Sequence, residues 1–287
     1  MKKSVGSVLI FSLLFCLASC QPYSNKANEV LSDAMKASEN QPDEPASQTG
    51  RLPIQTSVYS NPVKHVPSQE ELIKKYRVKS VKQIYKDGWL ISNYDKQGHK
   101  TGEESDYSGK RILTYEFDKD GRVTKEKTKY KDGSVVTILY TYNPAGQKIS
   151  RTFTGSDGKS SVIRYEYDTL LNTRTEISDT GRDKEFYDNR GLRVRFESYD
   201  EKGKLMGSGE AAYNQDGLKI RESGMIMGLS NNDVFEYNEA GQLYKQHRTG
   251  IVDVQFIYEY DDKGLIKTFT TIGGLSAGED TYEYVFY

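Results

Sequence analysis

The sequence predicts an all-β protein: an antiparallel β-meander, or repeat sheet, of roughly 16–18 short strands, with a short helix and a disordered tether ahead of it. Three observations lead to this fold class. A turn motif that ends in glycine recurs along the chain, apolar and polar residues alternate around each turn, and six of the seven prolines lie in one polar stretch near the N-terminus. The chain has 287 residues, of which 22 are tyrosine and 25 are glycine.

The first 19 residues have the features of a signal peptide. A cationic start, Met1-Lys2-Lys3-Ser4, precedes thirteen mostly apolar or small residues from Val5 to Leu17. A helix needs roughly 20 apolar residues to cross a hydrocarbon core of about 30 Å. Because this run is shorter, we interpret residues 1–19 as a secretory signal and not as a transmembrane anchor.

The end of this segment, Leu17-Ala18-Ser19-Cys20, resembles the lipobox of bacterial lipoproteins. The resemblance implies cleavage between Ser19 and Cys20, a diacylglyceryl group on the Cys20 thiol, and acylation of the new amino group with a chain such as palmitate. Two or three acyl chains on one residue hold a protein on a membrane, whereas one binds only marginally. Gln21 differs from the aspartate that retains enterobacterial lipoproteins at the inner membrane. We therefore expect an extracytoplasmic protein anchored to the outer membrane, with ordinary secretion and a chance cysteine as the alternative.

Residues 20–67 are predicted to be the lipidated N-terminus and a flexible tether. Proline has no backbone N–H to donate to a β-ladder, and a polar segment cannot bury enough apolar area to offset the cost of ordering. At Ser68-Gln69-Glu70-Glu71 a capping-box pattern precedes two apolar residues, which predicts a short helix through Lys75. The folded domain then spans residues 68–287.

The rest of the chain is predicted to be built from hairpins. An aromatic residue, then Asp or Asn, then two residues and a glycine recur eight times, mostly 23 to 26 residues apart, and Tyr167-Asp168 begins a ninth copy that has Leu171 in place of glycine. The Asp or Asn side chain can bond the backbone two residues on, and the glycine accepts the left-handed conformation that closes a type I turn with a bulge. The eight copies begin at Tyr94, Phe117, Tyr142, Tyr187, Tyr199, Tyr213, Tyr237 and Tyr260.

These units resemble the YD repeats of the Rhs family, whose core is tyrosine-x-tyrosine-aspartate-x-x-glycine. The best matches are Tyr258-Glu259-Tyr260-Asp261 to Gly264 and Tyr115-Glu116-Phe117-Asp118 to Gly121, and the resemblance covers residues 85–287. In that family the repeats wind into a hollow shell, often around a C-terminal toxin. We count too few repeats to close such a shell. We therefore expect an open, twisted and curved sheet without a toxin-delivery role.

Period-two alternation places the aromatic residues on one face of the sheet and Glu116, Glu166, Glu236 and Glu259 on the other. The glutamates are interleaved with Lys125, Lys127, Arg151 and Arg193, which predicts cross-strand charge pairs on a solvated face. An aromatic stripe forms the core if something covers it, whereas an exposed stripe would be a ligand surface for a peptide or glycan. The candidate ligand ladder comprises Tyr115, Phe117, Tyr140, Tyr142, Tyr165, Tyr167, Tyr258 and Tyr260.

The composition excludes several functions. With 40 Lys and Arg against 41 Asp and Glu, the chain has no general electrostatic hold on nucleic acid. Two cysteines exclude a disulfide scaffold or a multi-cysteine metal site, and there is no GxSxG, Walker or GxGxxG motif. We expect no catalysis, no cofactor, no metal and no nucleic-acid partner.

The expected function is a membrane-anchored, non-catalytic scaffold or binding surface for a protein, peptide or glycan partner. The alternative is an immunity or antitoxin-like partner of a secreted toxin, by analogy with repeat families near such systems.

Overall fold

The computed structural model describes residues 63–106, 109–274 and 277–287. The predicted signal peptide, Cys20 and all but the last five residues of the predicted tether lie outside this part of the chain. Within it there are one short helix and eighteen strands, so the predicted all-β class and strand number are confirmed. They are α3 (Gln69–Lys75), β1 (Val78–Tyr85), β2 (Gly88–Tyr94), β3 (Lys100–Ser105), β4 (Gly109–Phe117), β5 (Val123–Lys129), β6 (Val135–Tyr142), β7 (Lys148–Thr154), β8 (Ser160–Asp168), β9 (Thr173–Ser178), β10 (Gly181–Tyr187), β11 (Arg193–Asp200), β12 (Leu205–Tyr213), β13 (Lys219–Ile226), β14 (Leu229–Tyr237), β15 (Leu243–Gly250), β16 (Val254–Tyr260), β17 (Ile266–Gly273) and β18 (Gly278–Phe286).

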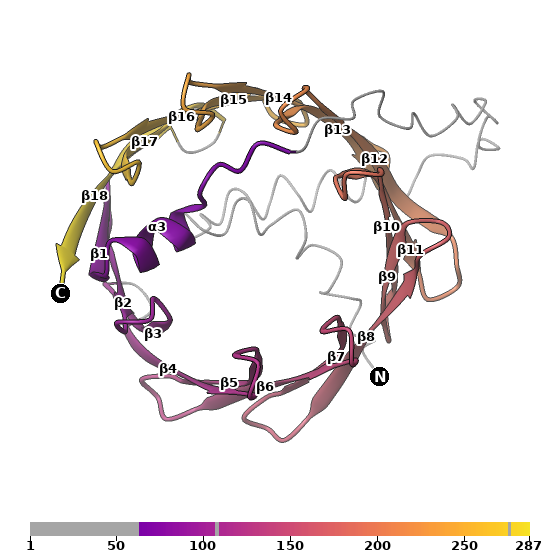
Figure 1. Cartoon of the computed structure of the whole chain (residues 1–287), viewed down its shortest axis with the longest axis horizontal. Helices are drawn as coiled ribbons and strands as arrows, with labels where there is room; N and C mark the ends of the chain where they lie inside the picture. The colour runs from indigo at the N-terminus through magenta and orange to yellow at the C-terminus, as the bar shows by residue number, and fades with distance from the viewer. Residues whose placement is uncertain (1–62, 107–108, 275–276) are drawn as a thin grey trace, which may run out of the picture.

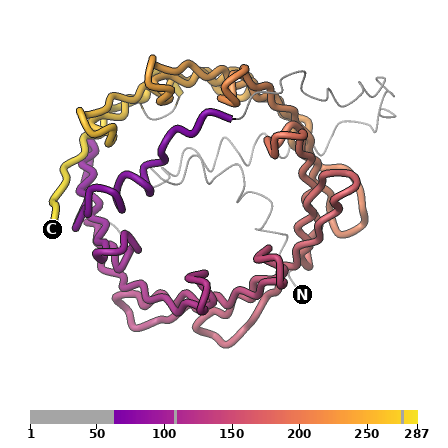
Figure 2. The backbone as a smooth tube through the Cα atoms, in the orientation of Figure 1, coloured from indigo at the N-terminus to yellow at the C-terminus, as the bar shows by residue number. Residues whose placement is uncertain are grey.

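The strands form one closed ring (Figures 1 and 2). Each strand pairs antiparallel with its neighbours in the chain, and β18 pairs antiparallel with β1, from Val78 opposite Phe286 to Ile84 opposite Thr281. The expectation of an open sheet is therefore wrong. Long antiparallel sheets twist and curl, and the register shift beside most of the glycine turns adds a bulge that bends the strand further. The curvature brings the two free edges together, and their pairing leaves no unpaired edge.

The recurring motif forms the predicted turn. At the motif that begins with Phe117, the N–H of Asp118 donates to the Arg122 carbonyl at 2.9 Å, and the N–H of Gly121 donates back to the Asp118 carbonyl at 3.0 Å. The Asp118 carboxylate accepts from the N–H groups of Asp120 and Arg122, both at 2.9 Å. Gly121 has φ +78°, a left-handed conformation that glycine adopts without steric cost.

The turns divide between the two ends of the ring. Seven of the eight complete motifs lie at one end, which we name the tyrosine rim, together with the incomplete motif at residues 168–172. The turn at 200–203 joins β11 to β12 at the opposite rim. Tyr199 follows Tyr187 by only twelve residues, which is the length of one strand with its turn. The turns of these two motifs therefore lie at the two ends of β11, on opposite rims.

The turn at residues 168–172 differs from its neighbours. Asp168 pairs with Thr173 across a loop of four residues, where the complete motifs have three. Asn172, not the residue at the glycine position, takes the left-handed conformation, with φ +49°. Asn tolerates this region better than most residues. The turn leaves Leu170 94% exposed and Leu171 61% exposed.

The segment before β1 runs along the inside of the ring at the tyrosine rim (Figure 1). Helix α3 has the predicted capping box: Ser68 Oγ accepts from the N–H of Glu71, and the Glu71 carboxylate accepts from the N–H of Ser68. Leu72 and Ile73 of the helix are buried with Val78 and Leu265 in the hydrophobic core. The Gln69 side chain also donates to the Gly264 carbonyl and accepts from the N–H of Ile266, which fixes α3 to the turn between β16 and β17.

Residues 63–68, which we name the strap, continue this contact over the neighbouring turns. An ideal Cβ built on Gly241 would lie 2.8 Å from Val66, and one on Gly217 would lie 2.7 Å from Val63. The N–H of Lys64 donates to the Asp216 carbonyl at 2.7 Å. The strap therefore packs directly on the glycines of these turns, where an added side chain would collide with it.

No helix among the described residues is long and apolar enough to cross a membrane.

Candidate binding surface on the inner face

The tyrosine face of the sheet lines the inside of the ring. Val81 lies opposite Tyr284 on one side and Ser92 on the other, and residues paired in this way point to the same face. Val81 and Tyr284 pack against the core that contains α3, which lies inside the ring (Figure 1). By the same register, the predicted ladder points inward around the ring.

Six tyrosines of the repeat make one recurring hydrogen bond. In all six cases the hydroxyl donates, at 2.6 to 2.8 Å, to a carbonyl of the strand that follows the preceding turn of the same rim along the chain. The acceptor is the first residue of that strand. This bond links one hairpin to the next along the rim. The donors and acceptors are Tyr142 to Val123, Tyr167 to Lys148, Tyr213 to Arg193, Tyr237 to Lys219, Tyr260 to Leu243, and Tyr284 to Ile266.

The candidate ladder is neither fully buried nor fully open. Tyr165 is buried, Phe117 is 40% exposed, and the other six rings are partly exposed. Tyr115 and Tyr140 lie beside Glu126, whose carboxylate accepts from the Tyr140 hydroxyl. Burial, followed by the negative charge of Glu126, raises the pKa of both Tyr115 and Tyr140 to about 12. That the ladder binds a ligand stays a prediction. Four of its hydroxyls already donate hydrogen bonds within the wall, those of Tyr140, Tyr142, Tyr167 and Tyr260.

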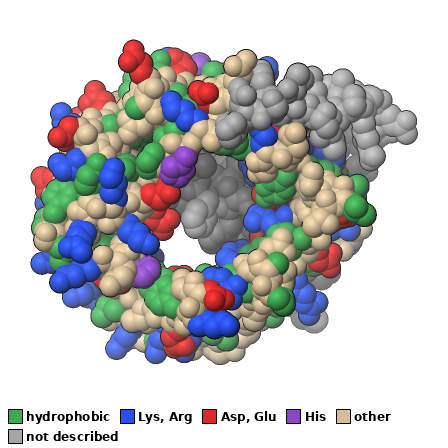
Figure 3. Space-filling model, viewed as in Figure 1, with side chains coloured by type: hydrophobic (Ala, Val, Ile, Leu, Met, Phe, Trp, Pro, Cys, Tyr) green, Lys and Arg blue, Asp and Glu red, His purple; other side chains and the backbone are tan. Residues whose placement is uncertain are grey.

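Charged side chains run between the tyrosines of the inner wall. Glu185 pairs with Arg174 at 2.6 Å and with Arg193 at 3.3 Å, and Glu222 pairs with Arg193 at 2.7 Å and with Lys219 at 2.7 Å. Five charges from β9 to β13 are thereby joined in one chain of ion pairs. Figure 3 shows charged side chains along the margin of the central opening.

Two of the residues predicted for the opposite face belong to this wall. Arg151 lies opposite Tyr140 and pairs with Glu176 at 2.9 Å, and Arg193 lies opposite Tyr187. The prediction that Arg151 and Arg193 lie on the outer face is therefore wrong. The bulge beside the turn of each complete motif adds one residue to the strand and inverts the alternation counted from the turn.

The outer face carries the other predicted charges. Glu116 pairs across the strands with Lys125 at 2.7 Å, and Glu236 pairs with Lys245 at 3.6 Å. Exposed pairs of this kind contribute little to stability, typically about 0–1 kcal/mol. The predicted cross-strand pairing is confirmed for Lys125, and the pair lies on a solvent-exposed face.

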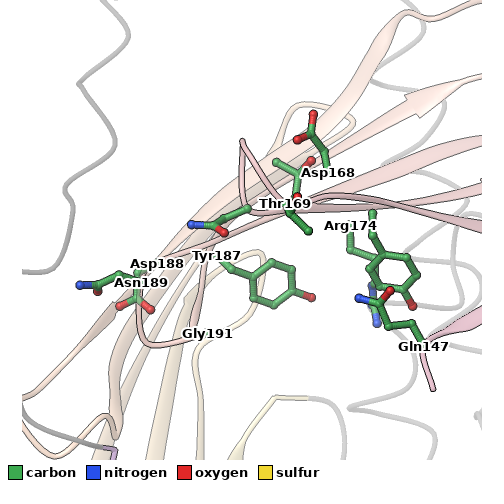
Figure 4. A pocket seen from close by; sticks show the side chains of 11 residues that line it. Gln147, Asp168, Thr169, Arg174, Tyr187, Asp188, Asn189 and Gly191 are labelled. Atoms are coloured by element: carbon green, nitrogen blue, oxygen red, sulfur yellow. The ribbon is translucent and has the colours of Figure 1, made fainter. Parts of the chain in front are cut away.

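A cavity of about 460 Å³ opens at the tyrosine rim beside the irregular turn. Its walls come from the turns at 143–147, 168–172 and 188–191 and from the strands that join them. The Tyr187 ring points across the cavity toward Gln147 and Arg174 (Figure 4). The Tyr187 hydroxyl donates to Glu185, and burial followed by this hydrogen bond raises its pKa to about 12. The cavity combines tyrosine rings, amides and an ion-paired arginine.

Sequence reasoning did not find this cavity. Two signals mark it: Leu171 in the glycine position, and an interval of only twenty residues between Tyr167 and Tyr187. At two other places on this rim, a side chain lies between neighbouring turns. The guanidinium of Arg122 lies 5.0 Å from the centre of the Tyr142 ring, and Arg190 donates to the carbonyls of Asn214 and Gln215.

Within residues 63–106, 109–274 and 277–287, no three or more His, Cys, Asp or Glu side chains are grouped so that they could hold a metal ion.

The closed ring, the glycine turns and the tyrosine bonds between hairpins define a β-repeat scaffold domain of the YD type, as the resemblance to Rhs repeats predicted. The family model described as teneurin YD-shell matches residues 47–272, and the chain belongs to this family. The match begins within the segment predicted to be the tether.

The solved structures to which this chain is similar include three from bacteria. A porin-like protein from Bacteroides uniformis has 10% identity and a TM-score of 0.42 over 73% of this chain and 97% of its own. A porin-like protein from Bacteroides vulgatus has 10% identity and a TM-score of 0.34 over 72% and 98%. The Tc holotoxin pore of Photorhabdus luminescens, carrying a TccC3 mutation, has 13% identity and a TM-score of 0.23 over 65% of this chain and 12% of its own. No curated protein matches the sequence.

Proposed function

We propose that the protein is a lipid-anchored, extracytoplasmic and non-catalytic scaffold whose ring presents a binding surface. One observation carries the scaffold role: the tyrosine hydroxyls donate to backbone carbonyls along the rim, and the inner carboxylates are ion-paired in the wall. Groups bound in this way stabilise the ring, and they are poorly placed to exchange protons with a substrate. A rigid ring with partly exposed tyrosine rings suits the recognition of another molecule.

The anchor is argued from the sequence and from where the strap lies. The lipobox-like segment ends at Cys20, and the described chain begins at Val63, which packs on Gly217 at the tyrosine rim. The 42 residues between them (21–62) would span about 32–39 Å as a random coil. An anchor at Cys20 therefore joins the ring at its tyrosine rim.

The anchor is tested by substitution of the two cysteines. In cells fed an alkyne-labelled fatty acid, Cys20→Ala should abolish labelling and move the protein out of the membrane fraction. The matched control, Cys16→Ala, should keep both the label and the membrane location, because Cys16 is predicted to leave with the signal peptide. A Cys20→Ala chain that stays with the membranes would contradict the proposal.

The binding role is tested with cell envelopes from a strain that lacks the protein. The labelled full chain carrying Cys20→Ala cannot insert by its lipid, so any retention reports recognition by the ring. We expect saturable retention that the unlabelled chain competes away. Retention that rises in proportion to concentration without saturating would argue against a specific partner.

A further inference from the structure

The strap is a segment of this chain that packs along the turns of the tyrosine rim. Val63 packs on Gly217 and Val66 packs on Gly241, so three residues of extended chain carry the strap from one turn to the next. Extended chain advances about 3.3 Å per residue, and two strands at about 4.8 Å each separate neighbouring turns. The two lengths agree at about 10 Å. The rim is therefore a track on which apolar side chains spaced three apart fit successive turns.

The strap covers only part of this track. Side chains of residues 63–74 lie against the turn glycines at 98, 217, 241 and 264, whereas among the described residues none comes within 4 Å of a Cβ built on Gly121 or Gly191. Beyond Gly191 the track reaches the cavity and the exposed side chains of Leu170 and Leu171. Exposed apolar side chains beside a cavity mark interaction surfaces more often than isolated ones do.

We propose that the open part of the tyrosine rim, from the turn at 188–191 to the turn at 143–147, binds an extended peptide segment of a partner protein with apolar side chains at every third position. One apolar side chain lies on Gly191 as Val63 lies on Gly217, and the next enters the cavity against Tyr187, beside the turn that carries Leu170 and Leu171. The amide and tyrosine groups of the cavity provide hydrogen bonds for the peptide backbone. This proposal names the partner class for the binding role proposed above.

The spacing argues for a partner segment over the chain's own upstream residues. If the chain upstream of Val63 followed the rim in the same way, with three residues for each turn, Ser60 would lie on Gly191 and Ser57 at the cavity. Neither residue has the apolar side chain that Val63 and Val66 bring to their turns. A segment with apolar residues at both places would bury surface that serine cannot.

The probe is a fluorescein-labelled synthetic peptide of residues 61–68, which contains Val63 and Val66 at the required spacing. It is titrated by anisotropy against the full chain carrying Cys20→Ala. We expect saturable binding, weakened at least fivefold when both valines of the peptide are serine. Leu170→Asp and Leu171→Asp should each weaken binding at least fivefold. Both variants should remain folded, because these side chains are exposed. Leu205→Asp, a change of a 50% exposed leucine at the opposite rim, is the matched control and should leave the affinity unchanged.

A photo-reactive group on the peptide then locates the site. Cross-links to residues 168–172 or 188–191 support the proposal, whereas cross-links to 214–217 or 238–241 mean exchange with the strap and overturn it. Absence of binding, or equal affinities for the Leu171→Asp and Leu205→Asp chains, also overturns it. Tighter binding by a Val58→Ser/Tyr59→Ser chain would identify the chain's own segment as the occupant and likewise refute the partner. None of these results decides whether the chain binds cell envelopes saturably, because that binding is measured in a separate experiment.

Discussion

Removing three tyrosine hydroxyls from the rim should lower the melting temperature of the ring substantially. The change is the triple substitution Tyr142→Phe, Tyr213→Phe and Tyr284→Phe, at the ends of β6, β12 and β18. Their hydroxyls donate to backbone carbonyls at 2.8, 2.8 and 2.7 Å. Phenylalanine keeps the ring and its buried area, so the change removes the hydrogen bond and little else.

The magnitude follows from the number of bonds. A net contribution of about 1 kcal/mol for each bond gives about 3 kcal/mol for the three, since the sites lie far apart and should be additive. For a domain of about 150–250 residues, 1 kcal/mol shifts the melting temperature by about 2–4 °C. We therefore expect the triple variant to melt about 6–12 °C below the parent.

The assay is thermal unfolding followed by circular dichroism, with Tyr130→Phe as the matched control. Tyr130 lies in a turn of the opposite rim and is 36% exposed, so its variant should melt within about 1 °C of the parent. A triple variant with the same melting temperature as the parent would refute the argument that these bonds join the hairpins.

Three further predictions concern the core, the strap and the pH dependence. Leu265→Ala should cost about 2–5 kcal/mol in the free energy of unfolding, because Leu265 is fully buried against Leu72 and Ile73, and an unchanged urea midpoint would contradict this core. Gly217→Ala should destabilise the protein and speed amide exchange in residues 63–66, because its Cβ would collide with Val63. Gly158→Ala, at a similar φ but in open space, should cost only the backbone strain, and equal exchange in both variants would contradict the strap contact. Burial raises the pKa of Tyr187, Tyr213 and Tyr260 to about 12, above the unfolded value of about 10, so their contribution to stability is complete below pH 10 and is lost as the pH rises from about 10 to 12. A titration of phenolate absorbance should show these groups ionising later in the native than in the denatured chain, and coincident curves would contradict it.

The turns could be predicted from the sequence because their chemistry is local. Asp118 and Gly121 need only each other and the residues between them to form the turn, and Ser68 with Glu71 likewise determines the start of α3. The same turns set the number of strands. The sequence motif therefore predicted the all-β class and the hairpin organisation.

Closure of the ring and the positions of the inner charges depend on less local effects. The pairing of Val81 with Tyr284 joins residues that lie about two hundred positions apart, and only the summed curvature of the sheet brings them together. Arg151 was assigned to the wrong face because the bulge after Gly146 shifts the alternation by one residue. The cavity at Arg174 and Tyr187 needs three turns at once, so no single motif indicates it.

The seam between β1 and β18 also limits how such a chain can change in length. Because the first and last strands meet antiparallel, and each strand in between reverses direction, the ring closes only with an even number of strands. Loss or duplication of a whole hairpin preserves this parity and yields a narrower or wider ring with the same seam. Gain of a single strand would bring the two edges together in parallel. The size of the ring can therefore evolve in steps of one repeat.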